Sequence, residues 1–426
     1  MIRTALQPAE QDTQPVEIPA RDEHIAPAPR VSIQAFCETV ETAAAIQAAG
    51  EDRRLAKAHL KIQMGGITAA MEAYRGAPTP NVIMLEFESR PDDILVGLDT
   101  LAEVCDSGTR VIIIGRHNDV LLYRELVRRG VSDYLITPLG TLDVVRSVSS
   151  LFSAPDAKPV GRVAAIVGAK GGVGASTIAH NVAWAISRDL ALDSVITDLD
   201  LPFGTAGLDF NQDPPQGIAD AVFSPERIDT AFVDRLLSKC SDHLSLLAAP
   251  ATLDRDYDFG TEAFDSVIDS LRATMPCIVL DVPHVWNGWT RRTLLSADDI
   301  LIVAAPDLAN LRNTKNMVDL LRAARANDHR PYYMLNQVGV PKRPEIKPSD
   351  FAKALDDDPV AIIPFEPQVF GTAANNGQMV AEVSGKHKAA ETFLQLAQLL
   401  TGRAEAKRSR SSLLTPLLEK LKKRSS

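Results

Sequence analysis

Short apolar runs rich in β-branched residues alternate along this chain with longer segments of helical periodicity, and they form two series. The first series has five runs, at residues 31–36, 59–64, 81–87, 110–115 and 132–136. The second has six, at residues 162–167, 194–198, 245–248, 277–281, 300–304 and 332–335. Strands that alternate with helices form parallel sheets covered by helices on both faces. We therefore predict two doubly wound α/β domains, the first of them flavodoxin-like.

Changes in composition indicate the domain boundaries. Residues 1–30 are rich in proline and polar side chains without hydrophobic periodicity, which predicts a disordered tail. Residues 153–160 have the composition of a linker, so we assign residues 31–152 to the first domain and 161–401 to the second. The remaining residues, 402–426, are basic and serine-rich.

Charge and composition narrow the class of protein. The 426 residues carry a formal net charge of −10, with 45% hydrophobic and 23% charged residues. This acidic balance argues against broad non-specific binding to nucleic acid, which depends on cationic side chains, and leaves local basic patches open. The four cysteines form no CxxC motif, which favours a reducing compartment. We find no signal peptide and no apolar stretch near the ~20 residues of a spanning helix, so we expect a cytoplasmic protein.

A glycine-rich segment, VGAKGGVGAST at residues 167–177, follows the first strand of the second series and leads into a helix predicted to open at Ser176. Backbone N–H groups and a helix N-terminus in this order surround a phosphate, and Ser176 offers the hydroxyl that ligates Mg²⁺. A glycine-rich turn without a ligand is the alternative. The nucleotide-binding residues predicted here are Lys170, Gly171, Gly172, Val173, Gly174, Ala175, Ser176 and Thr177.

This segment resembles the deviant Walker A motif of the ParA/MinD family, KGGxGK[ST]T, and the resemblance covers residues 161–401. It implies that Lys170 reaches across an ATP-sandwich homodimer to the phosphates of the other protomer. Ala175 stands where the general P-loop lysine belongs. Losing its charge-assisted hydrogen bonds costs about 1.5–3 kcal/mol each. We therefore expect ATP and Mg²⁺ to bind through the remaining groups, with weak or absent hydrolysis.

Acidic residues follow two later strands of the second series. Asp198 and Asp200 come after the strand at 194–198, and Asp281 ends the strand at 277–281. Carboxylates at the carboxyl end of a parallel strand are well placed for metal binding. By resemblance, Asp200 and Lys170 would serve catalysis, Asp200 by orienting the attacking water, while Asp198 and Asp281 would support Mg²⁺. Solvated acids after a strand are the alternative for the first pair.

Further segments match the same family in the same order. Asn336, in MLNQ at residues 334–337, matches an asparagine that recognises adenine, and Pro364 belongs to a segment similar to the IPxD motif. His284 and Trp286 follow Asp281 in what would be switch II. They either contact a partner when nucleotide is bound or are an ordinary loop histidine and a packed tryptophan.

The first domain resembles a response-regulator receiver in which the catalytic residues are replaced. Glu86 replaces the acceptor aspartate, Gly115 the expected serine or threonine, and Thr137 the lysine before proline. Without clustered acids to bind Mg²⁺, phosphotransfer lacks electrophilic assistance. We predict a pseudo-receiver domain that binds proteins or dimerises.

The C-terminal tail contains a short amphipathic segment. Thr415 and Pro416 suit the N-cap and first position of a helix. The segment is shorter than the ~12 residues that form a stable isolated helix, so it either contacts a membrane surface, through Leu413 to Arg424, or docks on its own domain. Its apolar face consists of Leu413, Leu414, Leu417, Leu418 and Leu421.

A degenerate receiver joined to a ParA/MinD-type domain with alanine in Walker A is similar to the CpaE/TadZ proteins of Flp (Tad) pilus assembly. The resemblance implies a bacterial cytoplasmic protein that dimerises with ATP, localises to a pole or to the cytoplasmic face of the inner membrane, and recruits the pilus assembly and secretion machinery. The alternative is an active MinD/ParA-type ATPase that positions cargo on the membrane or nucleoid.

Overall fold

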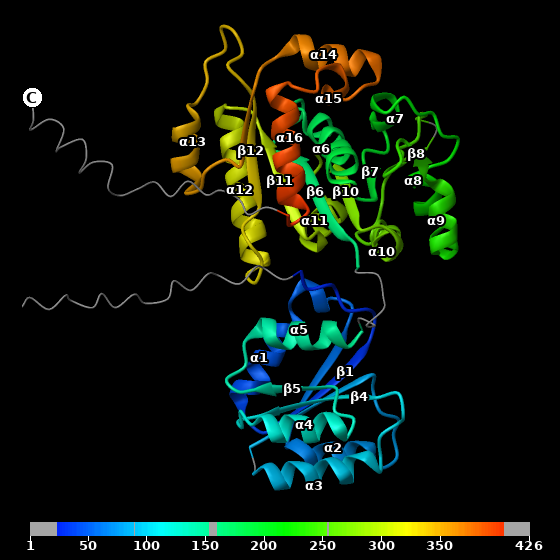
Figure 1. The fold of residues 1–426 in the computed structure, drawn as a ribbon, viewed down its shortest axis with the longest axis vertical. Helices are drawn as coiled ribbons and strands as arrows, with labels where there is room; N and C mark the ends of the chain where they lie inside the picture. Colours follow the sequence, from blue (N-terminus) through cyan, green and yellow to red (C-terminus); the bar gives the residue numbers. More distant parts are fainter. Residues whose placement is uncertain (1–23, 89, 153–159, 254, 404–426) are drawn as a thin grey trace, which may run out of the picture.

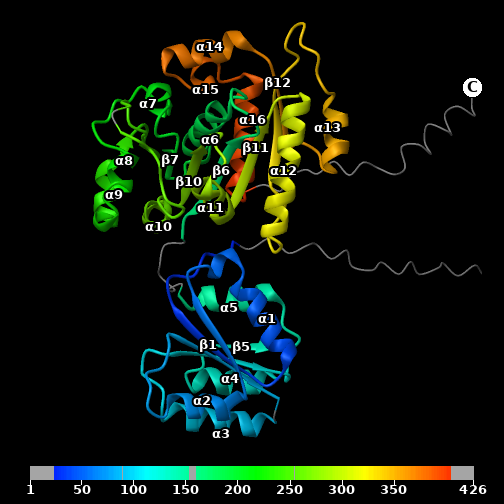
Figure 2. The same ribbon diagram turned by 180° about the vertical axis from the view of Figure 1, so that it is seen from behind.

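The computed structural model describes residues 24–88, 90–152, 160–253 and 255–403. Two parallel sheets lie in two lobes of an elongated molecule, one built from strands before residue 137 and the other from strands after residue 161 (Figures 1 and 2). The predicted fold class of two doubly wound α/β domains is confirmed.

The first sheet has the strand order β2-β1-β3-β4-β5, with all neighbours parallel. Every residue of its central strand β3 is buried, as expected when helices cover both faces. Helices α1 and α5 pack on one face, and α2, α3 and α4 on the other (Figure 1). The strands are β1 (Ser32–Cys37), β2 (His59–Met64), β3 (Val82–Phe87), β4 (Arg110–Gly115) and β5 (Asp133–Ile136). The helices are α1 (Val40–Gly50), the 3-10 helix η1 (Arg53–Leu55), α2 (Gly66–Tyr74), α3 (Pro91–Ala102), α4 (Val120–Arg128) and α5 (Thr141–Leu151).

The second sheet has the order β13-β12-β11-β6-β10-β7-β9-β8, and only β8 runs antiparallel to its neighbour. Strand β6, which leads into the glycine-rich segment, lies between β10 and β11 near the middle of the sheet. The strands are β6 (Arg162–Gly168), β7 (Ser194–Asp198), β8 (Ser238–Lys239), β9 (Leu244–Leu247), β10 (Cys277–Val282), β11 (Asp299–Ala304), β12 (Tyr332–Val338) and β13 (Ala361–Pro364).

Helices cover both faces of this second sheet as well. The helix after the glycine-rich segment, α6, packs with α7, α14, α15 and α16 on one face, and the remaining helices pack on the other. The first group is α6 (Ala175–Leu190), α7 (Ala206–Asp209), α14 (Pro367–Asn376), α15 (Val380–Val383) and α16 (Lys388–Leu400). The second is α8 (Ile218–Val222), η2 (Pro225–Arg227), α9 (Thr230–Leu236), α10 (Asp265–Thr274), α11 (Gly288–Ser296), α12 (Leu308–Ala324) and α13 (Pro348–Leu355).

Several details differ from the sequence-based expectations. Strands β8 and β13 were not predicted, and α6 begins at Ala175 rather than at Ser176. The expected start of the first domain at residue 31 is too late, because Ala28 is buried in its core and donates its N–H to the carbonyl of Arg54 at 2.8 Å.

The C-terminal segment from Leu413 to Arg424 and most of the expected linker lie outside the described residues, so the remaining domain boundaries stay predictions. Within the described ranges, no helix is both long enough and apolar enough to span a membrane.

Candidate functional site

The predicted acidic residues meet at the carboxyl edge of the second sheet. Strand β10 lies between β6 and β7, and its Asp281 is level with Asp198 of β7 and with Ile166 of β6. Both carboxylates are buried. The fold therefore brings Asp198, Asp281 and the glycine-rich loop together at one edge, although they are far apart in the sequence.

The glycine-rich loop is open on the side where a phosphate would lie. Gly172 and Gly174 have φ angles of 80° and 84°, which glycine adopts without steric cost. A Cβ added at Gly171 or Gly172 would meet no atom within 4 Å. Lys170 is exposed next to them, whereas Ser176 and Thr177 are half-buried in the first turn of α6.

Side chains from three neighbouring segments hold the carbonyl groups of this loop. Because a trans peptide points its C=O and N–H in opposite directions, fixing these carbonyls turns the following N–H groups to the other side of the loop. Since a carbonyl can only accept, His284 carries its proton on Nδ1. The four contacts are His284 Nδ1 to Gly168 O (2.9 Å), Asn313 Nδ2 to Ala169 O (2.9 Å), Gln337 Nε2 to Gly172 O (3.0 Å) and Asn336 Nδ2 to Val173 O (2.8 Å).

Ala175 occupies the position of the P-loop lysine with an apolar methyl group. It is half-buried and packs against the cluster between the sheet and α6, which includes Val173 and Ile178. A phosphate placed at this loop would meet backbone donors and no ammonium group at position 175.

A histidine that the motifs did not indicate lies beneath the loop. His180 of α6 is fully buried; its Nδ1 is 2.7 Å from Oδ2 of Asp209, and its Nε2 is 3.4 Å from Oδ2 of Asp281. Burial disfavours its charge, but these two carboxylates outweigh that effect and raise the pKa of His180 to about 10. His180 thus lies between two carboxylates, that of Asp209 in α7 and that of Asp281 in β10. In the sequence, His180 is only one polar residue within an apolar helical segment.

Asp198 is held by the backbone of the segment that follows it. Its two carboxylate oxygens accept the N–H groups of Asp200 and Ala206, both at 3.1 Å. Burial, and next the charge of Asp281, raise the pKa of Asp198 above its ordinary value. A bound cation would reduce the repulsion between the carboxylates of Asp198 and Asp281.

The oxygen donors at this edge suit Mg²⁺. Asp281 and the hydroxyl of Ser176 are hard oxygen ligands, and Asp198 adds negative charge behind them. Among the described residues, no three metal-ligating side chains are preassembled. Mg²⁺ ordinarily keeps several waters and binds nucleotide phosphates through one or two carboxylates, so this donor set fits it.

Asp200 lies in a tight turn after β7. It is half-buried, its Oδ1 accepts the N–H of Phe203 at 3.2 Å, and burial is the main reason that its pKa is raised. The structure therefore places Asp200 next to Asp198, whose carboxylate accepts its N–H, and its role toward water stays a prediction.

Asn336 and Pro364 lie at the ends of the neighbouring strands. Asn336 is inside β12 and buried, rather than after the strand, and its amide contacts the loop as described above. Pro364 is the exposed last residue of β13. Recognition of adenine by Asn336 stays a prediction.

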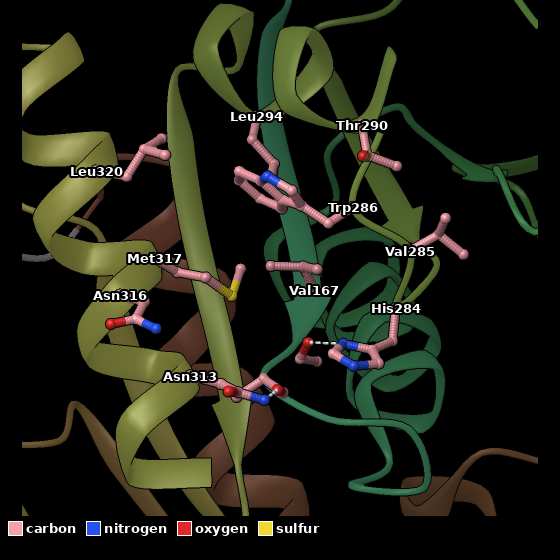
Figure 3. Close-up of a pocket in the computed structure, with 12 residues that line it drawn as sticks. Val167, His284, Val285, Trp286, Thr290, Leu294, Asn313, Asn316, Met317 and Leu320 are labelled. Carbon is pink, nitrogen blue, oxygen red and sulfur yellow. Dashed lines mark hydrogen bonds between the residues drawn. The ribbon is translucent and has the colours of Figure 1, made fainter. Parts of the chain in front are cut away.

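An apolar cavity of about 340 Å³ lies behind the loop, between α11 and α12 (Figure 3). His284 and Asn313 border it at the loop, and Trp286, Leu294 and Met317 line its apolar part. Trp286 is 51% exposed, and the packed tryptophan of this region is Trp289, which is 7% exposed. Trp286 is therefore not the packed tryptophan of one sequence-based interpretation, and its contact with a partner stays a prediction.

In the first domain, Glu86 is a structural carboxylate. It is 1% exposed and sits at the N-terminus of α1, where an anion is favoured. Its oxygens accept four hydrogen bonds, from Glu38 N (2.7 Å), Thr39 N (2.9 Å), Thr39 Oγ1 (2.7 Å) and Thr42 Oγ1 (2.6 Å). Internal contacts therefore occupy the carboxylate at the position that the sequence aligns with a phosphoacceptor, and the pseudo-receiver role of this domain stays a prediction.

Known proteins resemble the two parts of the chain separately, and no protein-family model matches it. The N-terminal part is 46% identical to a solved structure of the pilus assembly protein CpaE from Caulobacter crescentus; the match covers 31% of this chain and all of that one, with a TM-score of 0.30. The relationship rests on sequence identity across the whole of that solved chain.

The C-terminal part is similar to proteins of the ParA/MinD group. A solved ParA family ATPase from Chlorobium tepidum is 25% identical, with a TM-score of 0.51, and the match covers 56% of this chain and 99% of that one. The septum site-determining protein MinD from a Synechocystis species is 26% identical over 163 residues, or 38% of this chain. The chain spans 60% of the length of that MinD protein.

Proposed function

The chain belongs to the CpaE family of pilus assembly proteins, and on this premise we propose that it is an ATP-binding protein that dimerises around nucleotide and localises the assembly machinery of a Flp (Tad) pilus. Its second domain is of the ParA/MinD type. In this proposal, ATP acts as a signal for assembly, and hydrolysis is weak or absent.

The observation that carries this proposal is that side chains hold the glycine-rich loop, residues 168–174, from behind; we call it the phosphate loop from here on. Four side chains fix its carbonyls at Gly168, Ala169, Gly172 and Val173, so the loop keeps its shape without the P-loop lysine. A preorganised set of backbone N–H groups at a helix N-terminus is sufficient to bind an anion. ATP binding therefore survives the change to Ala175.

Mg²⁺ would be held by Ser176 and Asp281, with Asp198 behind them. When bound, it would neutralise phosphate charge and help to orient the triphosphate. Asp200, in the adjacent turn, would orient water. Because Ala175 provides no ammonium group to stabilise charge on the transferred phosphate, turnover is slow.

Dimerisation is supported by the surface around the loop. Large apolar side chains are exposed after the carboxyl ends of five parallel strands, and these ends lie at one edge of the sheet. Clustered exposed apolar residues are typical of interaction surfaces. Lys170, exposed in the same region, would reach the nucleotide of the other protomer. The residues are Phe203, Leu208, Leu253, Val285, Trp286, Leu308 and Phe365.

Calorimetry and steady-state turnover test this function together. We expect Mg²⁺-ATP to bind the purified chain at one nucleotide per protomer, with phosphate release close to background. Absence of binding at millimolar ATP would contradict the proposal. Rapid turnover that is lost in Asp200→Ala would favour the active MinD/ParA-type ATPase instead.

A further inference from the structure

The two domains are joined by an arginine of the receiver-like domain. Arg53, in η1, donates Nε to Asp328 (2.7 Å) and Nη1 to Asp298 (3.0 Å) and to the carbonyl of Ser296 (3.4 Å). Its side chain is only 12% exposed, and those of both aspartates are more deeply buried. Ser296 is the last residue of α11, and Asp328 follows the end of α12. Arg53 therefore links the receiver-like domain to the C-terminal ends of both helices.

Both aspartates also have partners within the second domain. Asp298 accepts from Arg272 at 2.7 Å, and Asp328 accepts from Arg325 at 2.8 Å. Asp298 further accepts the N–H of Val163, at the start of the strand that leads to the phosphate loop, at 2.9 Å. Removing Arg53 thus leaves neither carboxylate buried without a cation, so the second domain keeps its own ion pairs.

The opposite ends of the same two helices lie at the phosphate loop. Asn287, the N-cap of α11, comes directly after the segment in which His284 donates to the carbonyl of Gly168. Asn313, near the start of α12, donates to the carbonyl of Ala169. With 17 residues, α12 is about 25 Å long. Each helix is a stiff connection between the loop and the docking site of Arg53.

The space between these helices is not filled. The cavity of about 340 Å³ is lined by Leu294 of α11 and by Met317 and Leu320 of α12, and Trp286 lies between the helices (Figure 3). Close-packed helices resist displacement, whereas a cavity of this size leaves room for one helix to move against the other. The receiver-like domain contacts both helices where such a movement would be transmitted.

We propose that Arg53 is a positioning residue for the nucleotide site, through which the receiver-like domain sets the spacing of α11 and α12 and so the conformation of the phosphate loop. A protein that binds the receiver-like domain and shifts η1 then changes the affinity for nucleotide. Because coupling between two sites is reciprocal, ATP also changes how that protein is bound. The inference rests on the proposed nucleotide binding.

The test compares two substitutions at the same domain interface. Arg53→Ala removes the bonds from Arg53 to Ser296, at the end of α11, and to Asp298 and Asp328. The ion pair between Arg54 and Asp328 remains in this variant. Lys57→Ala removes the ion pair between Lys57 and Asp269, on the exposed side of α10, and leaves the bonds of Arg53 to Asp298 and Asp328 in place. Dissociation constants for Mg²⁺-ATP are measured by calorimetry for the full chain and both variants, and thermal unfolding confirms that each is folded.

We expect Arg53→Ala to weaken ATP binding by about two- to thirty-fold and Lys57→Ala to leave it unchanged. Hydrogen exchange without nucleotide should be faster at the amides of residues 168–174 in Arg53→Ala only. Adding Asn313→Ala should have less effect on ATP affinity in the Arg53→Ala background than in the unmodified chain, because Arg53 no longer positions α12.

The outcomes separate this inference from the proposed function. If the unmodified chain does not bind ATP, the proposed function fails. If it binds ATP and Arg53→Ala binds equally well with unchanged exchange at the loop, the coupling is refuted and the proposed function stands. Equal losses of ATP affinity in Arg53→Ala and Lys57→Ala would also refute the specific role of Arg53.

Discussion

Asn336 donates its side-chain amide to the carbonyl oxygen of Val173 at 2.8 Å, and this contact joins the end of β12 to the phosphate loop. The next residue, Gln337, donates its side-chain amide to the carbonyl oxygen of Gly172. Its φ angle is 56°, which is uncommon for a residue with a side chain. A strained backbone is kept where the surrounding contacts require it. The loop is therefore shaped by β12 as well as by its own glycines.

Replacing Asn336 distinguishes support of the loop from recognition of the base. We expect Asn336→Ala to weaken binding of ATP and of inorganic triphosphate by the same factor, about five- to tenfold, because a lost hydrogen bond of about 1 kcal/mol acts through the loop. Competition binding measures both ligands. A loss confined to ATP would instead assign Asn336 to adenine.

Restoring the P-loop lysine tests how far the loop compensates for it. Ala175→Lys should tighten ATP binding by about tenfold or more, because an ammonium group adds charge-assisted hydrogen bonds of about 1.5–3 kcal/mol each. Calorimetry measures the change, and Ala175→Met provides a control of similar length without charge. Equal affinities in the unmodified chain and Ala175→Lys would refute this explanation of the site.

Glu86 is expected to stabilise the first domain rather than to accept phosphate. In Glu86→Gln an amide N–H replaces an oxygen that accepts hydrogen bonds from Thr39 and Thr42, so we expect a loss of about 2–3 kcal/mol in the free energy of unfolding. Urea unfolding followed by circular dichroism measures it. Glu88→Gln is the matched control, because Glu88 is partly exposed in a surface ion pair with Arg116 and should change stability by less than ~1 kcal/mol. Equal losses of unfolding free energy in Glu86→Gln and Glu88→Gln would contradict a structural role for Glu86.

The domain interface should weaken in acid. Burial opposes the charge of Asp328, but Arg53 and then Arg325 hold its pKa to about 2, below the ordinary 3.8. A lowered pKa stabilises the fold at pH values above the ordinary pKa, and this contribution disappears as the pH falls from about 4 through about 2. The difference in unfolding free energy between the unmodified chain and Asp328→Asn should be about 2 kcal/mol at pH 7 and should shrink at pH 3. A difference that does not change with pH would contradict this prediction.

The central strands could be predicted from the sequence because they are buried on both faces and are therefore continuous apolar runs, as β3 and β10 are. The strands that were missed lie toward the edges of the second sheet. Strand β8 has only two residues, and β13 exposes Ile362 and ends in proline. Such strands carry neither strict alternation nor a continuous apolar run.

The candidate site was only partly predictable for a related reason. The loop and its acids are local motifs. By contrast, the role of His180 depends on its contact with Asp209, 29 residues away, and that of Arg53 on its contact with Asp328, 275 residues away. Only the folded sheet and the docked domains bring these partners together. Periodicity and short motifs contain no information about such contacts.

Size analysis of the purified full chain with ATP, with ADP and without nucleotide shows whether ATP drives dimerisation. Light scattering coupled to chromatography, with Mg²⁺ present throughout, measures the mass of each form. We expect a dimer with ATP and a smaller species with ADP or without nucleotide. We also expect Trp286→Ser, which removes an exposed apolar side chain beside the loop, to weaken the ATP-dependent dimer. An identical mass under all three conditions would refute ATP-dependent dimerisation.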